Sequence, residues 1–342
     1  MKEQLRVLVL CHPDGVPPAT MEGLSEKEID FYKTEYDVIT ALTELGHEVR
    51  VLGVQYDLKP IRDEIAAWKP DVVFNLLIEF HGEAVYGQNI ASFLELMRVP
   101  YTGCNPRGQV LAQGKDLSKK LLKYHRIATP AFVVFHPGRK IYRPARLRFP
   151  LIVKSTIEDG SMGISQASVV ETDEELAERV RFIHEHLGTP AIAEQFIDGR
   201  EIYVGVLGND RLKALPVWEL QFENQTNGNH FIATERVKRN VKYQEQIGVK
   251  IGPAEDISPN ACGRIRDVAK RICKVLDVDG YARIDFRLGH DGVPYFIEAN
   301  PNPEIARSEE YAQSAAHDGL PYPELINRIL ALAIARTGAE AE

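Results

Sequence analysis

Residues 280–303, GYARIDFRLGHDGVPYFIEANPNP, form the stretch that decides the fold. They contain two β-rich segments, YARIDFRL and PYFIEAN, on either side of Asp291-Gly292. An aspartate-glycine pair between two such segments is a strong signal for a tight hairpin turn. The sequence therefore predicts two antiparallel strands joined at this turn.

Four polar side chains fall in register on this hairpin. Because strand side chains alternate between faces, Arg283 and Asp285 share one face of the first strand. Glu298 and Asn300 share one face of the second strand for the same reason. Asp, Glu and Asn supply the oxygen ligands that Mg²⁺ takes alongside substrate phosphates, and an arginine can bind a planar anion. A solvated hairpin with unused charges is the alternative, but four groups on an otherwise apolar hairpin favour a site.

The composition describes a globular protein of more than one module. The chain has 342 residues, 44% of them hydrophobic and 26% charged, and a chain of this length is typically divided into two or three domains. The net charge of −8 predicts no nucleic-acid partner, since such proteins usually carry a basic face. No apolar run approaches the roughly 20 residues of a membrane helix, and four scattered cysteines are typical of a reducing compartment. We therefore expect a cytoplasmic protein with no membrane contact.

The N-terminal part alternates strands with helices. Buried-strand patterns at 6–10, 48–54 and 71–77 are separated by helical patterns, and this alternation predicts a parallel, doubly wound sheet. Ligands of such sheets bind beyond the carboxyl ends of the strands. The loops after Leu10 and Leu77 are therefore candidate substrate loops.

The rest of the chain predicts an α+β arrangement, within a protein that is α/β as a whole. Helical patterns occupy 115–126, 172–188, 258–276 and 320–336. Three strands at 191–197, 201–209 and 214–220 suggest one antiparallel sheet.

A glycine-rich loop follows the strand that carries Lys154. The loop, DGSMGIS at 159–165, contains Gly160 and Gly163, which let backbone N–H groups approach an anion, and Ser161 adds a hydroxyl. Such a turn alone is usually structural. Together with the strand lysine and the downstream Asp/Glu/Asn set, it indicates a nucleotide site. The sequence contains neither a P-loop nor a dinucleotide-binding glycine motif.

The motifs of the chain resemble the ATP-grasp superfamily, and specifically the D-alanine–D-alanine ligases and their relatives, over nearly the whole length. The matching segments are VPYTGCNP, the K-x₃-KK helix start at Lys115, IVKS with DGSMGIS, AEQFIDGREIYVGVL, VKY at 241–243, GPA at 252–254, ARIDFR with YFIEANPNP, and SAAHDGLPYPELI. The resemblance implies an ATP-grasp fold that is preceded in the chain by an N-terminal, doubly wound pre-ATP-grasp domain. The implied modules are 1–110, a central subdomain at 111–195 and a C-terminal subdomain at 196–342.

The resemblance also implies the roles of the site residues. Those that would bind ATP are Lys115 and Lys154 on the phosphates, Ser161 and Gly163 in the loop, Glu194 at the adenine edge, Ile197 after the hinge, Glu201 on the ribose, and Lys242 over the γ-phosphate. Asp285, Glu298 and Asn300 would hold two Mg²⁺ ions, with Mn²⁺ as an alternative and Glu298 bridging. Arg283 would stabilise an acyl-phosphate and a tetrahedral oxyanion.

The chain departs from the family at the amino-acid end of the site. Gly160 replaces a serine that links an N-terminal glutamate to a loop tyrosine, although Tyr243 and Glu28 (or Glu26 as second choice) remain for catalytic roles. The first module carries an unusual loop, PPATMEGLSEKE.

A further departure is the segment NPEIARSEE. By the resemblance, it puts Glu304 and Glu309 near the place where a carboxylate of the second substrate would bind, which is electrostatically adverse. Ser308 could partly substitute as a donor. We therefore expect a carboxylate–amine ligase that acts through an acyl-phosphate on small molecules other than two D-alanines. A genuine D-alanine–D-alanine ligase is the closest alternative, and an inactive ATP-binding regulatory protein is a second. The family makes a homodimer the expected assembly.

Overall fold

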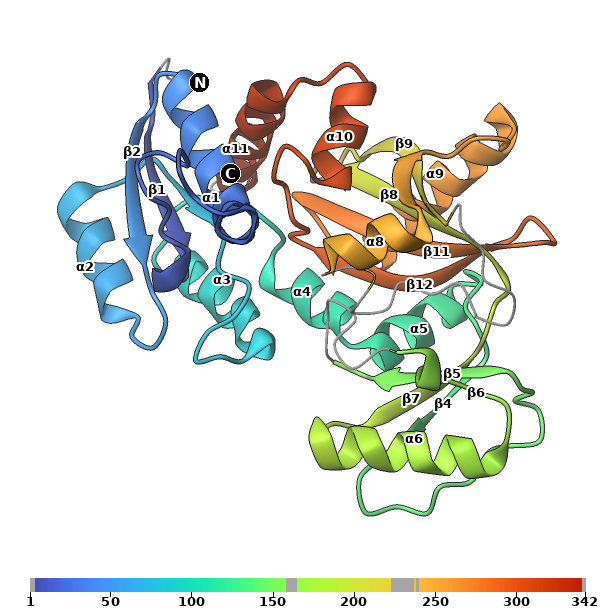
Figure 1. Cartoon of the computed structure of the whole chain (residues 1–342). Coiled ribbons are helices and arrows are strands. Elements are labelled where there is room, and N and C mark those ends of the chain that lie inside the picture. Colours follow the sequence, from blue (N-terminus) through green and yellow to red (C-terminus); the bar gives the residue numbers. More distant parts are fainter. Residues whose placement is uncertain (1–3, 158–164, 223–236, 238–239, 340–342) are drawn as a thin grey trace.

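The computed structural model describes residues 4–157, 165–222, 237 and 240–339. Figure 1 shows three sheets, with helices packed between and around them. Each sheet falls within one of the three predicted modules, and the exact module boundaries stay a prediction. No helix in the described part of the chain is both long enough and apolar enough to cross a membrane.

The first sheet is parallel and doubly wound, which confirms the prediction for the N-terminal part. Alternate residues of β1 serve opposite faces: Val7 and Val9 pack toward α1, and Leu8 and Leu10 pack toward α2 and α3. The strands, in the order β2-β1-β3, are β1 (Arg6–Cys11), β2 (Glu48–Gly53) and β3 (Val72–Asn75). The helices are α1 (Glu26–Glu44), α2 (Lys59–Trp68) and α3 (Gly87–Leu96), with short 3-10 turns η1 (Pro13–Gly15) and η2 (Ala84–Tyr86).

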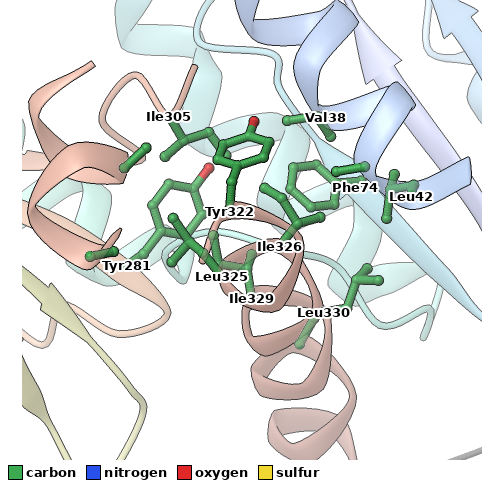
Figure 2. Close-up of a cluster of buried hydrophobic side chains, with 14 of the residues drawn as sticks. Val38, Leu42, Phe74, Tyr281, Ile305, Tyr322, Leu325, Ile326, Ile329 and Leu330 are labelled. Atoms are coloured by element: carbon green, nitrogen blue, oxygen red, sulfur yellow. The ribbon is translucent and has the colours of Figure 1, made fainter. Parts of the chain in front are cut away.

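The last helix of the chain completes the core of the first sheet. Helix α11 (Tyr322–Ala339) places Ile326 and Leu330 against Phe74 of β3 and Leu42 of α1 (Figure 2). The same cluster contains Tyr281 from the start of the predicted hairpin. The N-terminal sheet is therefore buried against residues from the far end of the chain.

The second sheet is antiparallel, in the order β4-β7-β5-β6, and helix α6 covers it. Its elements are β4 (Phe132–Phe135), β5 (Leu151–Ser155), η3 (Gln166–Ser168), β6 (Val169–Val170), α6 (Asp173–His186) and β7 (Ala191–Gln195). The prediction that residues 191–197 share a sheet with the next two strands is wrong. Gln195 N–H donates to Ala131 O and Phe196 N–H donates to Pro150 O, which keeps this segment in the second sheet to its end.

The third sheet is antiparallel and contains the predicted hairpin, which is confirmed. Its order is β10-β9-β8-β11-β12, and α4 and α5 lie along β12 (Figure 1). The strands are β8 (Gly199–Leu207), β9 (Lys213–Phe222), β10 (Val249–Pro253), β11 (Tyr281–Gly289) and β12 (Pro294–Pro301). The helices are α4 (Pro106–Gln113), α5 (Lys115–Tyr124), α8 (Val241–Ile247), α9 (Pro259–Val275) and α10 (Glu310–His317).

A close contact, here called the joint, fixes Gly103 and Cys104 at the end of the first module against Asn302 at the end of the hairpin. Cys104 N–H donates to Asn302 Oδ1 at 2.6 Å, and Arg336 of α11 donates to Gly103 O at 2.9 Å. Gly103 has a φ of +96°, and a Cβ added there would lie 2.5 Å from Asn302 Oδ1. Only glycine meets both the backbone and the space requirement at this position.

We expect Gly103→Ala to destabilise the fold by about 1–3 kcal/mol, because it combines an unfavourable φ with a clash at the joint. Gly263→Ala is the matched control, since Gly263 lies in α9 and a Cβ there would meet nothing within 4 Å. The control should gain about 0.5–1 kcal/mol from better helix propensity. Denaturant unfolding of both variants tests this, and equal stability of the two would contradict the role of the joint.

Candidate active site

The polar residues of the β11–β12 hairpin come together around Asp285. In the strand register Arg283 lies opposite Asn300, and Asp285 lies opposite Glu298. Arg283 donates from Nε to Asp285 Oδ1 at 2.8 Å and from Nη2 to Oδ2 at 2.9 Å. Asn300 donates its side-chain amide to the same Oδ2 at 3.0 Å. The two strands therefore build one connected polar group from Arg283, Asp285 and Asn300, with Glu298 opposite Asp285.

The guanidinium of Arg283 is held in a fixed position. Its Nη1 also donates to Glu310 at the start of α10, and its Cζ lies 4.9 Å from the centroid of the Tyr203 ring. Burial opposes the charge of Arg283, but Asp285 and Glu310 outweigh it and raise the arginine pKa above its usual range. A fixed, permanently charged guanidinium is suited to stabilise negative charge that develops in a reaction.

The predicted metal ligands form a set of oxygen donors. Asp285 and Glu298 face each other across the hairpin, and Asn300 lies two residues further along β12. Because Asn300 uses its amide nitrogen toward Asp285, its amide oxygen remains as an acceptor. Two carboxylates and one amide oxygen fit the hard-oxygen preference of Mg²⁺. Within the described residues no group of three or more His, Cys, Asp and Glu side chains could hold a metal, so this set depends on the amide.

Three buried lysines and two glutamates form a chain of charges beside the hairpin, here called the lysine–glutamate chain. Lys115 Nζ lies 3.5 Å from Glu298 Oε2. Lys154 Nζ of β5 lies 3.2 Å from Glu194 Oε2, and Lys119 Nζ of α5 lies 3.3 Å from Glu194 Oε1. Three ammonium groups and two carboxylates leave one excess positive charge, which favours binding of a polyanion.

Lys119 has no role among the sequence predictions, although a signal for it exists. Lys115 and Lys119 are four residues apart, and that spacing places them on one face of a helix. The partners of Lys119 come from β7 and β12, which are distant in the sequence, so only the folded structure reveals them.

A second unpredicted residue, Arg287, ties together two residues that were predicted to bind the base and the ribose. Its Nε donates to Ile197 O at 3.2 Å, and its Nη1 lies 3.3 Å from Glu201 Oε2. Tyr203 donates its hydroxyl to Glu201 Oε1 at 2.9 Å. Strand alternation places Arg287 on the same face as Arg283, and this was the signal that could have found it.

A cavity of ≈ 180 Å³ lies between the first module and the hairpin. The loop that follows Leu77, which the sequence marks as a candidate substrate loop, faces this cavity together with Arg283. The lining residues are Leu77, Ile78, Gln109, Gln113, Arg283, Asn300, Pro301, Asn302, Pro303 and Glu304.

Lys33 of α1 neutralises part of the acidic segment beyond the hairpin. Its Nζ lies 2.5 Å from Glu309 Oε1, 3.4 Å from Glu304 Oε1 and 2.8 Å from Asp30 Oδ1. Helix α1 thus supplies a cation that Glu304 and Glu309 share, which the sequence does not indicate. No sequence pattern connects residues 276 positions apart, so the pairing could not be foreseen.

Two carboxyl groups near this segment titrate above their usual range. Burial raises the pKa of Glu35 to about 7, and the charge of Glu304 adds to the shift. Burial likewise raises the pKa of Glu309 to about 7, again with a contribution from Glu304. Near neutral pH this end of the site therefore carries less negative charge than its number of carboxylates suggests.

The remaining predicted site residues lie elsewhere or outside the described part of the chain. Glu28 is exposed and accepts hydrogen bonds from Ser25, which places it in the N-terminal cap of α1. Lys242 and Tyr243 lie in the first turn of α8, and Lys242 is exposed. Ser161 and Gly163 lie outside the described residues. The roles predicted for these residues stay predictions.

Comparisons with known proteins agree with this architecture. A family model described as "D-ala D-ala ligase C-terminus" matches residues 121–331. An uncharacterized protein, y4sG of Sinorhizobium fredii, is 31% identical over 302 residues, or 86% of each chain. A D-alanine–D-alanine ligase of Desulfotalea psychrophila is 33% identical over 275 residues, which cover 78% of this chain and 79% of the relative.

Solved structures show the same fold. A D-alanine–D-alanine ligase from Bacillus anthracis complexed with ATP superposes with a TM-score of 0.76 at 20% identity, covering 98% of this chain and 99% of that one. The VanG D-Ala:D-Ser ligase from Enterococcus faecalis superposes with a TM-score of 0.69 at 21% identity, covering 96% and 99%. The family model spans more than half of the chain, and the relatives match most of it at about 30% identity. The chain therefore belongs to the D-alanine–D-alanine ligase family of ATP-grasp enzymes.

Proposed function

We propose that the protein is an ATP-dependent carboxylate–amine ligase that acts through an acyl-phosphate and joins substrates other than two D-alanines. The observation that carries this proposal is the position of Arg283. It lines the cavity while Asp285, on the same strand, and Glu310 hold its guanidinium in place. A substrate in the cavity would thus lie beside a fixed positive charge and beside Asn300 of the hairpin.

ATP would bind along the lysine–glutamate chain, with Lys115 and Lys154 on its phosphates. Glu201 and the backbone at Ile197, both held by Arg287, would contact the ribose and the base. Glu194 would lie at the adenine edge, Ser161 and Gly163 would contact the phosphates, and Lys242 would lie over the γ-phosphate. These assignments follow the family, one of whose structures is a complex with ATP.

Mg²⁺ would be held by Asp285, Glu298 and Asn300, with two ions and a bridging Glu298 as the finer form of this proposal. When bound, it would neutralise charge on the transferred phosphoryl group. The contribution of the chain itself is to hold these oxygens on two strands in fixed register, with Lys115 beside Glu298.

The reaction would run in two steps. A substrate carboxylate attacks the γ-phosphate and gives an acyl-phosphate and ADP; an amine then attacks the acyl carbon and phosphate leaves. Arg283 would donate to the oxygens that gain charge in both steps, and the cavity would align the reactants. Burial raises the pKa values of Cys11 and Cys273 to about 12, which disfavours these two thiols as nucleophiles.

The acidic segment supports a second substrate that is cationic or lacks a free carboxylate. Glu304 lines the cavity, and its nearest cation, Lys33, is shared with Asp30 and Glu309. A carboxylate next to the attacking amine would meet this excess of negative charge. The same Lys33 also favours the second candidate, a genuine D-alanine–D-alanine ligase, because it reduces the repulsion by one charge.

Several finer expectations remain part of the proposal. Tyr243 and Glu28 would take part at the amino-acid end, and the protein would act in the cytoplasm as a homodimer. The modules would be 1–110, 111–195 and 196–342.

We expect Glu298→Gln to lower ADP release about 100-fold or more, because it removes a charge from the proposed metal ligands and from the partner of Lys115. Glu178→Gln makes the same chemical change at an exposed position of α6 and serves as the control. ADP release is measured with a panel of acid and amine pairs in the presence of Mg²⁺. Unchanged turnover in Glu298→Gln would remove this residue from the metal site.

Amine preference is tested by pairing D-alanine with three amines: D-alanine itself, alaninamide and a diamine. We expect ADP release to be about tenfold faster with the amide or the diamine, since neither brings a second carboxylate toward Glu304. Glu304→Gln should reduce that preference. Fastest turnover with D-alanine alone would favour the genuine D-alanine–D-alanine ligase, and product mass would identify the bond formed.

A further inference from the structure

Lys119 is a fully buried lysine whose ammonium contacts two parts of the site. It donates to Ile297 O at 2.6 Å and to Phe296 O at 3.2 Å, next to the proposed metal ligand Glu298. It also lies 3.3 Å from Glu194 Oε1. Burial lowers the pKa of Lys119 to about 8, which reflects the cost of keeping this charge away from water.

Glu194 is the buried carboxylate that two lysines share. Its side chain is 1% exposed; Oε1 faces Lys119 and Oε2 faces Lys154 at 3.2 Å. A buried carboxylate that loses its cation costs several kcal/mol. Lys154 can therefore move away from Glu194 at low free-energy cost only if another cation remains paired with this carboxylate.

We propose that Lys119 is a positioning residue that acts as the counter-ion of Glu194 and thereby leaves Lys154 able to bind a phosphate of ATP. This rests on the proposed function, in which Lys154 contacts the ATP phosphates. With Lys119 present, the three side chains carry a net charge of +1, and Glu194 keeps one ion pair when Lys154 turns to the nucleotide. Without Lys119 the net charge is zero, and Lys154 is the cation left to balance a buried carboxylate.

The two roles of Lys119 can be separated by the choice of substitution. Lys119→Gln removes the charge but keeps an N–H donor for the carbonyl groups of β12. Lys120→Gln is the matched control, because Lys120 is the next residue of α5 and its side chain is 59% exposed and paired with Asp116. The same charge is lost in both variants, but only one loss occurs beside Glu194.

The test is equilibrium binding of ATP to the full chain, measured by calorimetry without Mg²⁺ and without the other substrates, so that no turnover occurs. We expect Lys119→Gln to weaken binding about tenfold or more, and Lys120→Gln to change it by less than about threefold. Glu194→Gln in the Lys119→Gln background should restore affinity to within about threefold of Glu194→Gln alone, because Lys154 no longer has a carboxylate to balance. A purely structural role of Lys119 would not give this rescue.

Each other outcome has a defined meaning. Equal ATP affinity in wild type and Lys119→Gln overturns the role of Lys119 and leaves the proposed function intact. Failure of the wild type to bind ATP, also after Mg²⁺ is added, overturns the proposed function itself. If Lys119→Gln alone does not fold, the role of Lys119 is still tested by comparing the ATP affinity of Glu194→Gln with that of the double variant Lys119→Gln/Glu194→Gln. Equal affinity of those two supports the proposal, and a tenfold loss in the double variant overturns it.

Discussion

The antiparallel register between β11 and β12 is the constraint on which the rest of the site depends. It sets Arg283 opposite Asn300 and Asp285 opposite Glu298, so four groups from two strands occupy one face. Backbone hydrogen bonds fix this register, and a slip by one residue would turn every side chain of one strand to the other face. On the far side β11 pairs with β8 along its whole length, which brings Tyr203 beneath Arg283 and Glu201 beside Arg287. Strand β11 thus contributes Arg283 to the cavity and, further along, Arg287 to the residues that are predicted to bind the nucleotide.

Charge balance is the second organising constraint. Arg283 of the hairpin itself pairs with Asp285 and Glu310, while the cations beside Glu298 and Glu309 come from separate helices: Lys115 from α5 and Lys33 from α1. Buried charges are tolerated when they are paired, so each cation stabilises the position of the element that carries it. The ion pairs of Lys33 join α1 of the first module to the segment just beyond β12. The arrangement of the modules and the electrostatics of the site therefore depend on each other.

Sequence reasoning anticipated the elements with strong local signals. The hairpin was readable from its turn and its alternation, and the N-terminal sheet from the alternation of strands and helices. The assignment of 191–197 to the sheet of β8 and β9 failed, because three closely spaced strands carry no local sign of a change of sheet. Glu28 was selected by spacing, yet in the fold it caps α1 beside Ser25, a local interaction that competes with any role further away.

The sequence by itself determined which residues could do chemistry and which strand face they share, because side-chain alternation and turn preference are local properties. It also indicated the family, because the motifs stand along the chain in the same order as in the D-alanine–D-alanine ligases. Only the tertiary structure decided how the charges are balanced. Lys33 reaches Glu309, Lys119 and Lys154 share Glu194, and α11 completes the core of the N-terminal sheet. These contacts join residues far apart in the chain, and burial and pairing energies exist only once the elements have packed.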